Sequence, residues 1–251
     1  MIKIQINNQT IDGIELVIFD KDGTLMDLYH YWSQIIGLRA RFICERLGLG
    51  KEYQNNLLYA MGIDIEARKL RPEGPVGIKK KQVVLQTAAD YLASIDYPEM
   101  EKLCIDVFDE VDELSSENLE QFIRPINGVY ELIDEIINHG CKIAVATTDT
   151  TQRAKIAMDF LGISNKVDCV IGANLVRNSK PDPEMIHVIL DTLKVDKSNA
   201  VMIGDAITDV QIGINADLKA SIGVLTGLSS YEQLNAITPY IAKSVSKIKI
   251  S

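Results

Sequence analysis

Cysteine and positive charge are both scarce in this sequence, and each shortage excludes a class of protein. The 251 residues contain no CxxC pair, and the four cysteines are Cys44, Cys104, Cys141 and Cys169. Such wide spacing is not that of a disulfide framework, so we expect reduced thiols and a cytoplasmic protein. The formal net charge is -9 and the pI is about 4.9. We therefore expect neither a nucleic acid nor an anionic membrane as a partner.

Several signatures of other protein classes are missing as well. No apolar run is long enough to cross a bilayer, and residues 1–10 lack the apolar segment of an export signal, so we expect no export. The three histidines share no metal-ligand spacing, which argues against a zinc site. No GxxxxGK[ST] motif is present, which argues against a Walker-type phosphate loop.

Short apolar runs alternate with helical patterns in the second half of the chain. The runs cover residues 142–146, 167–171, 200–203 and 220–224, and a similar run covers residues 16–19. Strands that alternate with helices predict βαβ units and a parallel sheet covered on both faces. We therefore predict a doubly wound, Rossmann-like α/β core. The alternating residues 2–6 predict an edge hairpin ahead of it.

The segment between these two regions has a different texture. Residues 28–124 carry helical periodicity and few β-branched runs, with a loop at residues 71–75. We predict a helical cap domain of residues 28–124, inserted into a core domain made of residues 1–27 and 125–251.

Polar side chains gather where the predicted core strands end. Asp20 and Asp22 follow the first strand, Thr147 ends the next, and Asp205 follows a third. Lys180 lies in the loop between the last two. Because ligands bind beyond the carboxyl ends of parallel strands, we expect these side chains to meet on one rim.

These residue types suit phosphoryl transfer. Asp20 can attack phosphorus and form an aspartyl-phosphate. Attack by an anion on a phosphate requires neutralisation, which Mg²⁺ supplies, and Asp20 and Asp205 are the natural pair of ligands, with the Asp22 carbonyl in reach. Thr147 can hydrogen-bond a phosphoryl oxygen, and Lys180 can balance the charge of the transferred group. Asp22 can protonate the leaving oxygen and later deprotonate water.

Four segments resemble the motifs of the haloacid dehalogenase superfamily of phosphohydrolases, in the family's order. They are FDKDGT at residues 19–24, VAT at 145–147, KPDP at 180–183 and GDAITD at 204–209. Taken alone, Asp-x-Asp-Gly after a strand is an ordinary turn, but four motifs at strand ends favour the functional interpretation. The layout is similar to phosphoglycolate-phosphatase-like members with a helical cap.

The resemblance implies a role for each matched residue. Asp20 would be the nucleophile and Asp22 the acid and base. Asp20, Asp205 and the Asp22 carbonyl would hold Mg²⁺. Asp209 would be a partner of the metal site or of Lys180.

Other residues have weaker claims on the substrate. Thr148 adjoins the second motif and is expected to pack or cap the next helix, although it also competes with Thr147 for the phosphate. Arg71 in the 71–75 loop is a candidate for the far end of the substrate. His30 lies in an aromatic cluster just after the first motif, where packing is the simpler role. Lys21, between the two aspartates, is expected to point away from the ligand.

We therefore predict a Mg²⁺-dependent phosphomonoesterase that acts on a small phosphorylated metabolite, with the helical domain as a lid that sets specificity. One alternative is a phosphomutase or phosphotransferase that uses the same aspartyl-phosphate. Another is a phosphate-ligand-binding protein without turnover. Dehalogenase activity is disfavoured, because the resemblance implies that those relatives lack the second aspartate. The substrate, the choice between monomer and homodimer, and the role of the N-terminal hairpin stay open.

Overall fold

The computed structural model describes residues 1–71, 73–77, 81–118 and 121–251. It divides into two compact units. The core unit consists of Met1–Asp27 and Arg124–Ser251, and the helical unit consists of Leu28–Ile123. Among the described residues, no helix combines the length and apolar character needed to cross a membrane.

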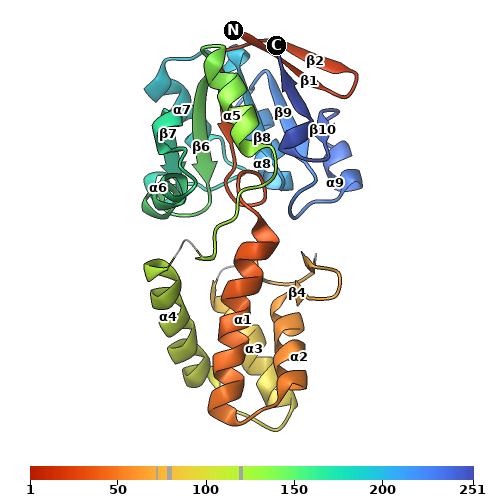
Figure 1. Cartoon of the computed structure of the whole chain (residues 1–251), viewed down its shortest axis with the longest axis vertical. Coiled ribbons are helices and arrows are strands. Elements are labelled where there is room, and N and C mark those ends of the chain that lie inside the picture. The colour runs from red at the N-terminus through yellow and green to blue at the C-terminus, as the bar shows by residue number, and fades with distance from the viewer. Residues whose placement is uncertain (72, 78–80, 119–120) are drawn as a thin grey trace. The chain divides into compact units, whose positions relative to one another are not determined.

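A six-stranded parallel sheet forms the centre of the core unit, in the order β10-β9-β8-β3-β6-β7 (Figure 1). Its strands are β3 (Leu16–Phe19), β6 (Lys142–Thr147), β7 (Cys169–Gly172), β8 (Ala200–Gly204), β9 (Ala220–Val224) and β10 (Ile241–Ala242). All four residues of β3 are buried, because a parallel strand covered on both faces needs a continuous apolar run. The predicted doubly wound α/β fold is confirmed.

Helices pack on this sheet through their apolar faces. They are α5 (Val129–Asn138), α6 (Thr151–Phe160), α7 (Glu184–Leu193), α8 (Ile207–Asn215) and α9 (Tyr231–Asn235). Met185, Ile186 and Ile189 of α7 form one buried cluster with Leu16 and Ile18 of β3. Short 3₁₀ turns lie at Ser164–Lys166, Ala173–Leu175, Lys197–Asn199 and Val245–Lys247. This packing buries the central strand on both faces and so fixes where its carboxyl end lies in the core unit.

The predicted N-terminal hairpin pairs with the end of the chain. Strands β1 (Ile2–Ile6) and β2 (Gln9–Ile14) form an antiparallel sheet with β11 (Ile248–Ile250), in the order β11-β1-β2. Residues of β1 are alternately buried and exposed, which is the pattern of a sheet with one face on the core. The hairpin is thus a separate small sheet rather than an edge of the main one.

The helical unit is built from α1 (Leu28–Leu47), α2 (Lys51–Met61), α3 (Lys81–Ser94) and α4 (Glu101–Glu117), with a short hairpin of β4 (Ile63–Asp64) and β5 (Lys69–Leu70). Its core contains a buried cation. The guanidinium of Arg39 lies 4.0 Å from the centre of the Phe108 ring, and its Nη2 lies 2.7 Å from Asp112 Oδ1. The ion pair and the ring compensate for the burial of this charge.

Candidate active site

The parallel sheet brings the ends of three strands side by side. Strand β3 lies between β8 and β6, so Asp20 after β3 adjoins Asp205 after β8 and Thr147 at the end of β6. The backbone N–H of Asp20 continues the ladder by donating to the Ile203 carbonyl at 2.8 Å. Sheet topology alone therefore places these three residues on one edge.

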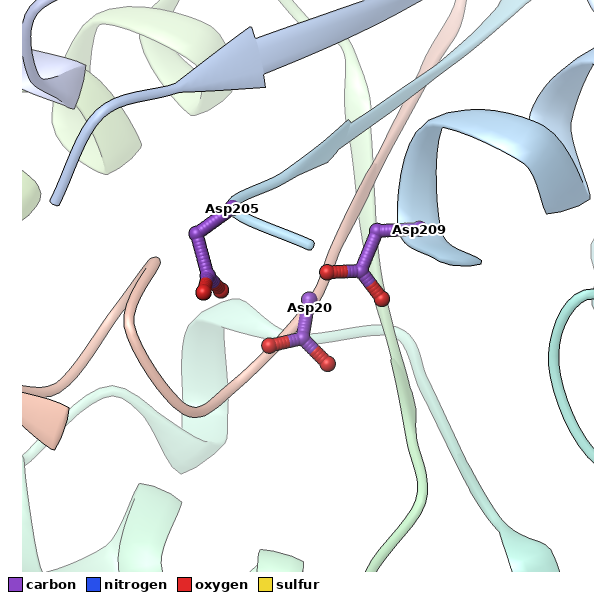
Figure 2. A group of neighbouring side chains, drawn as sticks. All are labelled: Asp20, Asp205 and Asp209. Atoms are coloured by element: carbon purple, nitrogen blue, oxygen red, sulfur yellow. The ribbon is translucent and has the colours of Figure 1, made fainter. Parts of the chain in front are cut away.

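Three carboxylates converge at this edge. Figure 2 shows the side chains of Asp20, Asp205 and Asp209 gathered at one place from three separate segments of the chain. All three are buried, and one oxygen from each lies within 4.8 Å of the others. Asp209 comes from the first turn of α8. Lys180 joins the trio from the segment before α7, with its Nζ 2.7 Å from Asp20 Oδ1 and 2.7 Å from Asp209 Oδ1.

The carboxylate of Asp205 is held from two sides. Its Oδ1 accepts from the Thr24 hydroxyl at 3.3 Å, and its Oδ2 accepts from the Leu228 backbone N–H at 2.9 Å. The chain closes tightly over it: a Cβ added at Gly23 would lie 2.5 Å from its Cγ, and one at Gly227 would lie 1.9 Å from its Oδ2. Only glycine fits at these two positions.

The charges of this cluster are unbalanced. Burial raises the pKa of Asp20 to about 7, with repulsion from Asp209 adding to the effect and Lys180 opposing it. Burial and the same repulsion also raise the pKa of Asp205. Burial works against the charge of Lys180, but the two carboxylates beside it outweigh that effect and raise its pKa. One ammonium thus faces three acids, and full ionisation leaves an excess of negative charge.

Comparison with known proteins decides the family. The family model of haloacid dehalogenase-like hydrolases matches residues 14–217. The chain belongs to this family. The match runs from the strand before Asp20 to the helix that carries Asp209, so it includes every segment of the carboxylate cluster.

Curated relatives of this hydrolase include phosphatases. Pyrophosphatase PpaX of Bacillus velezensis is 30% identical over 133 residues, which are 53% of this chain and 61% of that protein. The probable phosphatase IndB of Dickeya dadantii is 32% identical over 114 residues, 45% of this chain and 49% of that protein. The chain thus spans only about half to two thirds of the length of these relatives.

Solved structures share the fold of this hydrolase. A predicted phosphoglycolate phosphatase from Haemophilus somnus has a TM-score of 0.69 at 17% identity, covering 94% of this chain and 96% of its own. A haloacid dehalogenase superfamily hydrolase of subfamily IA from Geobacter sulfurreducens has a TM-score of 0.65 at 17% identity, covering 94% of both chains. Both likenesses are evidence for the fold alone.

The residues of the cluster fit a Mg²⁺ ion. The donors are carboxylate oxygens, which hard divalent cations prefer. The second oxygen of Asp20, Oδ2, accepts no hydrogen bond from the residues that the structure describes. Both oxygens of Asp209 accept hydrogen bonds, from Lys180 and from the Ala206 N–H at 3.0 Å, as both oxygens of Asp205 do from Thr24 and Leu228. A dication would also balance the excess negative charge.

The remaining predicted residues of the core unit lie beside the cluster. Thr147 is fully buried, and its Oγ1 accepts from the Asp149 N–H at 3.1 Å, which leaves its own O–H to donate. Thr148 is exposed. The cap of α6 is Thr150 and not Thr148. Asp22 is outside the trio, and its carboxylate contacts Lys21 instead.

The two weak candidates in the helical unit have partners inside that unit. His30 Nε2 lies 3.3 Å from the Gln121 carbonyl oxygen. The guanidinium of Arg71 donates to Glu73 and to the Tyr59 carbonyl, and stacks 3.9 Å from the centre of the Tyr59 ring. These contacts give both residues structural roles, and a role in substrate binding stays a prediction.

Sequence reasoning missed two residues around the cluster and left the partner of a third, Lys21, unidentified. Thr24 was inside the first motif but had no role, and Leu228 lies in the loop after β9. The sequence pattern indicates that loop, because β9 is one more parallel strand with its carboxyl end on the same edge. Lys21 was expected to point away from the ligand. It is buried, with its ammonium on the Asp22 carboxylate.

Proposed function

We propose that this hydrolase is a Mg²⁺-dependent phosphatase that works through an aspartyl-phosphate on Asp20. The observation that carries the proposal is a buried carboxylate at a central strand end, flanked by one lysine and two further acids. An anionic nucleophile in such a site needs a cation beside it, and a phosphate monoester needs the same cation.

The two steps divide between Asp20 and Asp22. An oxygen of Asp20 attacks phosphorus, the bond to the leaving oxygen breaks, and that oxygen takes a proton from Asp22. Asp22 then takes a proton from water, whose oxygen attacks the phosphorus of the aspartyl-phosphate. Phosphate leaves, and the Asp20 carboxylate is regenerated.

The neighbouring residues bind the transferred group. The buried ammonium of Lys180 neutralises phosphoryl charge, and the O–H of Thr147 donates to a phosphoryl oxygen. Asp209 holds Lys180 in place through its 2.7 Å contact. Asp20, Asp205 and the Asp22 carbonyl would hold Mg²⁺, which supplies Lewis-acid neutralisation of the phosphate when bound.

The names of the relatives add a second class of substrate to be tested. One is named a pyrophosphatase and another a probable phosphatase, so phosphate anhydrides join phosphate monoesters as candidates. Attack by Asp20 on either class breaks a P–O bond by the same two steps. The cluster itself contacts only the phosphoryl group, so it does not discriminate between the two classes.

The test is phosphate release from small phosphate esters and inorganic pyrophosphate, with Mg²⁺ and with a chelator. We expect Mg²⁺-dependent release by the wild type and its loss in Asp20→Asn. The matched control is Asp191→Asn, the same change at an exposed position on α7. Trapped phosphoenzyme should carry one phosphoryl group on Asp20.

Each outcome has a clear meaning. Release that survives chelation would contradict the metal site, and release by Asp20→Asn would remove Asp20 as nucleophile. Isomerised sugar phosphate without release would replace the phosphatase by a phosphomutase. Binding of phosphate without any turnover would make the protein a receptor for the ligand.

A further inference from the structure

Lys21 is a buried lysine that has no part in the mechanism proposed above. Only 3% of the residue is exposed, although lysine normally keeps its ammonium in water. Burying that charge is costly unless it is paired. Its partners therefore show what the side chain is held for.

The ammonium of Lys21 joins two loops of the candidate site. Its Nζ lies 2.7 Å from Asp22 Oδ1 and 3.5 Å from Asp149 Oδ2. Asp149 follows β6 and donates its backbone N–H to Thr147. Lys21 therefore connects the loop after β3, which carries Asp22, to the loop after β6, which adjoins Thr147. Asp149 also lies 3.5 Å from Arg153 Nε, which continues the chain of charges onto α6.

A tight loop after β3 produces this contact. The carbonyl of Lys21 accepts from the N–H groups of Leu25 and Met26, and the N–H of Gly23 donates to the Met26 carbonyl. Gly23 has a φ of 86°, which favours glycine. The strand alternation that would separate the Lys21 and Asp22 side chains ends here, and the turn brings them together.

The Asp22 carboxylate has little else to orient it. About a quarter of its side chain is exposed, so the carboxylate is open to solvent on one side. Among the residues that the structure describes, Lys21 is the one hydrogen-bond donor to its carboxylate. An acid that must reach a leaving oxygen within hydrogen-bond distance loses rate when it samples other rotamers.

We propose that Lys21 is a positioning residue for proton transfer by Asp22. It holds Oδ1, which leaves Oδ2 as the oxygen that gives and later takes the proton. Asp149, in the loop after β6, holds the ammonium from the other side, so that Asp22 keeps a fixed position relative to Thr147. The inference rests on the proposed function, because it assigns Lys21 a part in the same reaction.

Two substrates whose leaving groups differ in basicity distinguish a role in proton transfer from a merely structural role. An alkyl phosphate releases a basic alkoxide and needs the proton, whereas 4-nitrophenyl phosphate releases a stable anion and needs it little. A general acid that is out of position therefore slows the first substrate and spares the second. Damage to the fold or to the nucleophile slows both equally.

The experiment is single-turnover phosphorylation of Asp20 by each substrate, measured with full-length Lys21→Met. We expect a loss of about 10- to 100-fold with the alkyl phosphate and of less than about 3-fold with 4-nitrophenyl phosphate. In an Asp22→Asn background, the same substitution should change the rate by less than about 2-fold, because the group it positions is gone. The matched control is Lys197→Met, which removes an exposed lysine paired with Asp217.

A second variant keeps the inference testable if circular dichroism shows that Lys21→Met does not fold. Asp149→Asn leaves Lys21 its contact with Asp22 but removes the anchor on the other loop. We expect a smaller loss, about 3- to 10-fold, again confined to the alkyl phosphate.

The outcomes distinguish this inference from the proposed function. An active wild type whose Lys21→Met and Asp149→Asn variants lose the same rate on both substrates overturns the inference alone. So does a loss that persists undiminished in the Asp22→Asn background. A wild type that phosphorylates Asp20 with neither substrate overturns the proposed function, and the positioning role with it.

Discussion

The buried carboxylate of Asp20 should make the stability of the metal-free protein depend on pH. Its pKa is about 7 in the folded protein, against 3.8 for an unperturbed aspartate. Between these values the folded state binds more protons than the unfolded state. The free energy of unfolding therefore falls as pH rises from about 4 to about 7, and this contribution is constant outside that window.

The size of the effect follows from the shift. About 1.4 kcal/mol per pKa unit gives a total of about 4 kcal/mol, of which about 3 kcal/mol is lost between pH 5 and pH 8. The raised pKa of Asp205 acts in the same direction. On the proposed function Mg²⁺ would bind the ionised carboxylates, so added Mg²⁺ should stabilise the protein more at pH 8 than at pH 5.

Urea unfolding at pH 5 and pH 8, in chelator and in Mg²⁺, measures these changes. Circular dichroism is the appropriate signal, because it follows the helices and strands of both units, whereas the single tryptophan, Trp32, lies in the helical unit. Asp20→Asn should remove about 3 kcal/mol of the pH dependence, and Asp191→Asn should leave it intact.

Two results would refute this reasoning. One is a wild type that is equally stable or more stable at pH 8 than at pH 5 in chelator. The other is an Asp20→Asn variant that loses as much stability over this range as the wild type does. Either would mean that the carboxylate is not held in the charged, buried cluster described above.

Three further predictions concern other parts of the core unit. Lys180→Met should cost about 3–5 kcal/mol of unfolding free energy in chelator at pH 8, because it leaves buried carboxylates unpaired, and an unchanged urea midpoint would contradict the ion pairs. Gly227→Ala should cost about 1–3 kcal/mol and weaken Mg²⁺-dependent stabilisation, whereas Gly50→Ala, whose Cβ meets nothing within 4 Å, should do neither. In thiol labelling of the native protein at pH 8, half-buried Cys169 should react before Cys141, because burial raises the pKa of Cys141 to about 12. Faster labelling of Cys141 would contradict its placement.

The fold was readable from the sequence where the signal is local. The run LVIF of β3 is apolar at every position, and a strand covered on both faces by helices requires that pattern. Parallel pairing then follows from the alternation of strands and helices. Parallel pairing also fixes which ends of the strands meet, so Asp20, Thr147 and Asp205 were predictable neighbours.

Element boundaries were less predictable, because side chains from other elements set them. The strand predicted at residues 167–171 is β7 at Cys169–Gly172. Val167 closes a 3₁₀ turn, and Asp168 Oδ2 accepts from the Ile143 N–H at 2.8 Å. The partner of the N-terminal hairpin was likewise hidden, since β11 pairs with it from the opposite end of the sequence.

The sequence by itself determined the chemistry available at the site: which carboxylates, hydroxyl and ammonium follow the strands, and in what order. Only the tertiary structure decided which of them form ion pairs and hydrogen bonds with one another. Lys180 meets Asp20 across 160 positions and Thr24 meets Asp205 across 181, and no local pattern encodes such pairs. Lys21 is the plainest case. Its neighbours in sequence predict a side chain on the other face, and the turn after β3 instead buries its ammonium against Asp22.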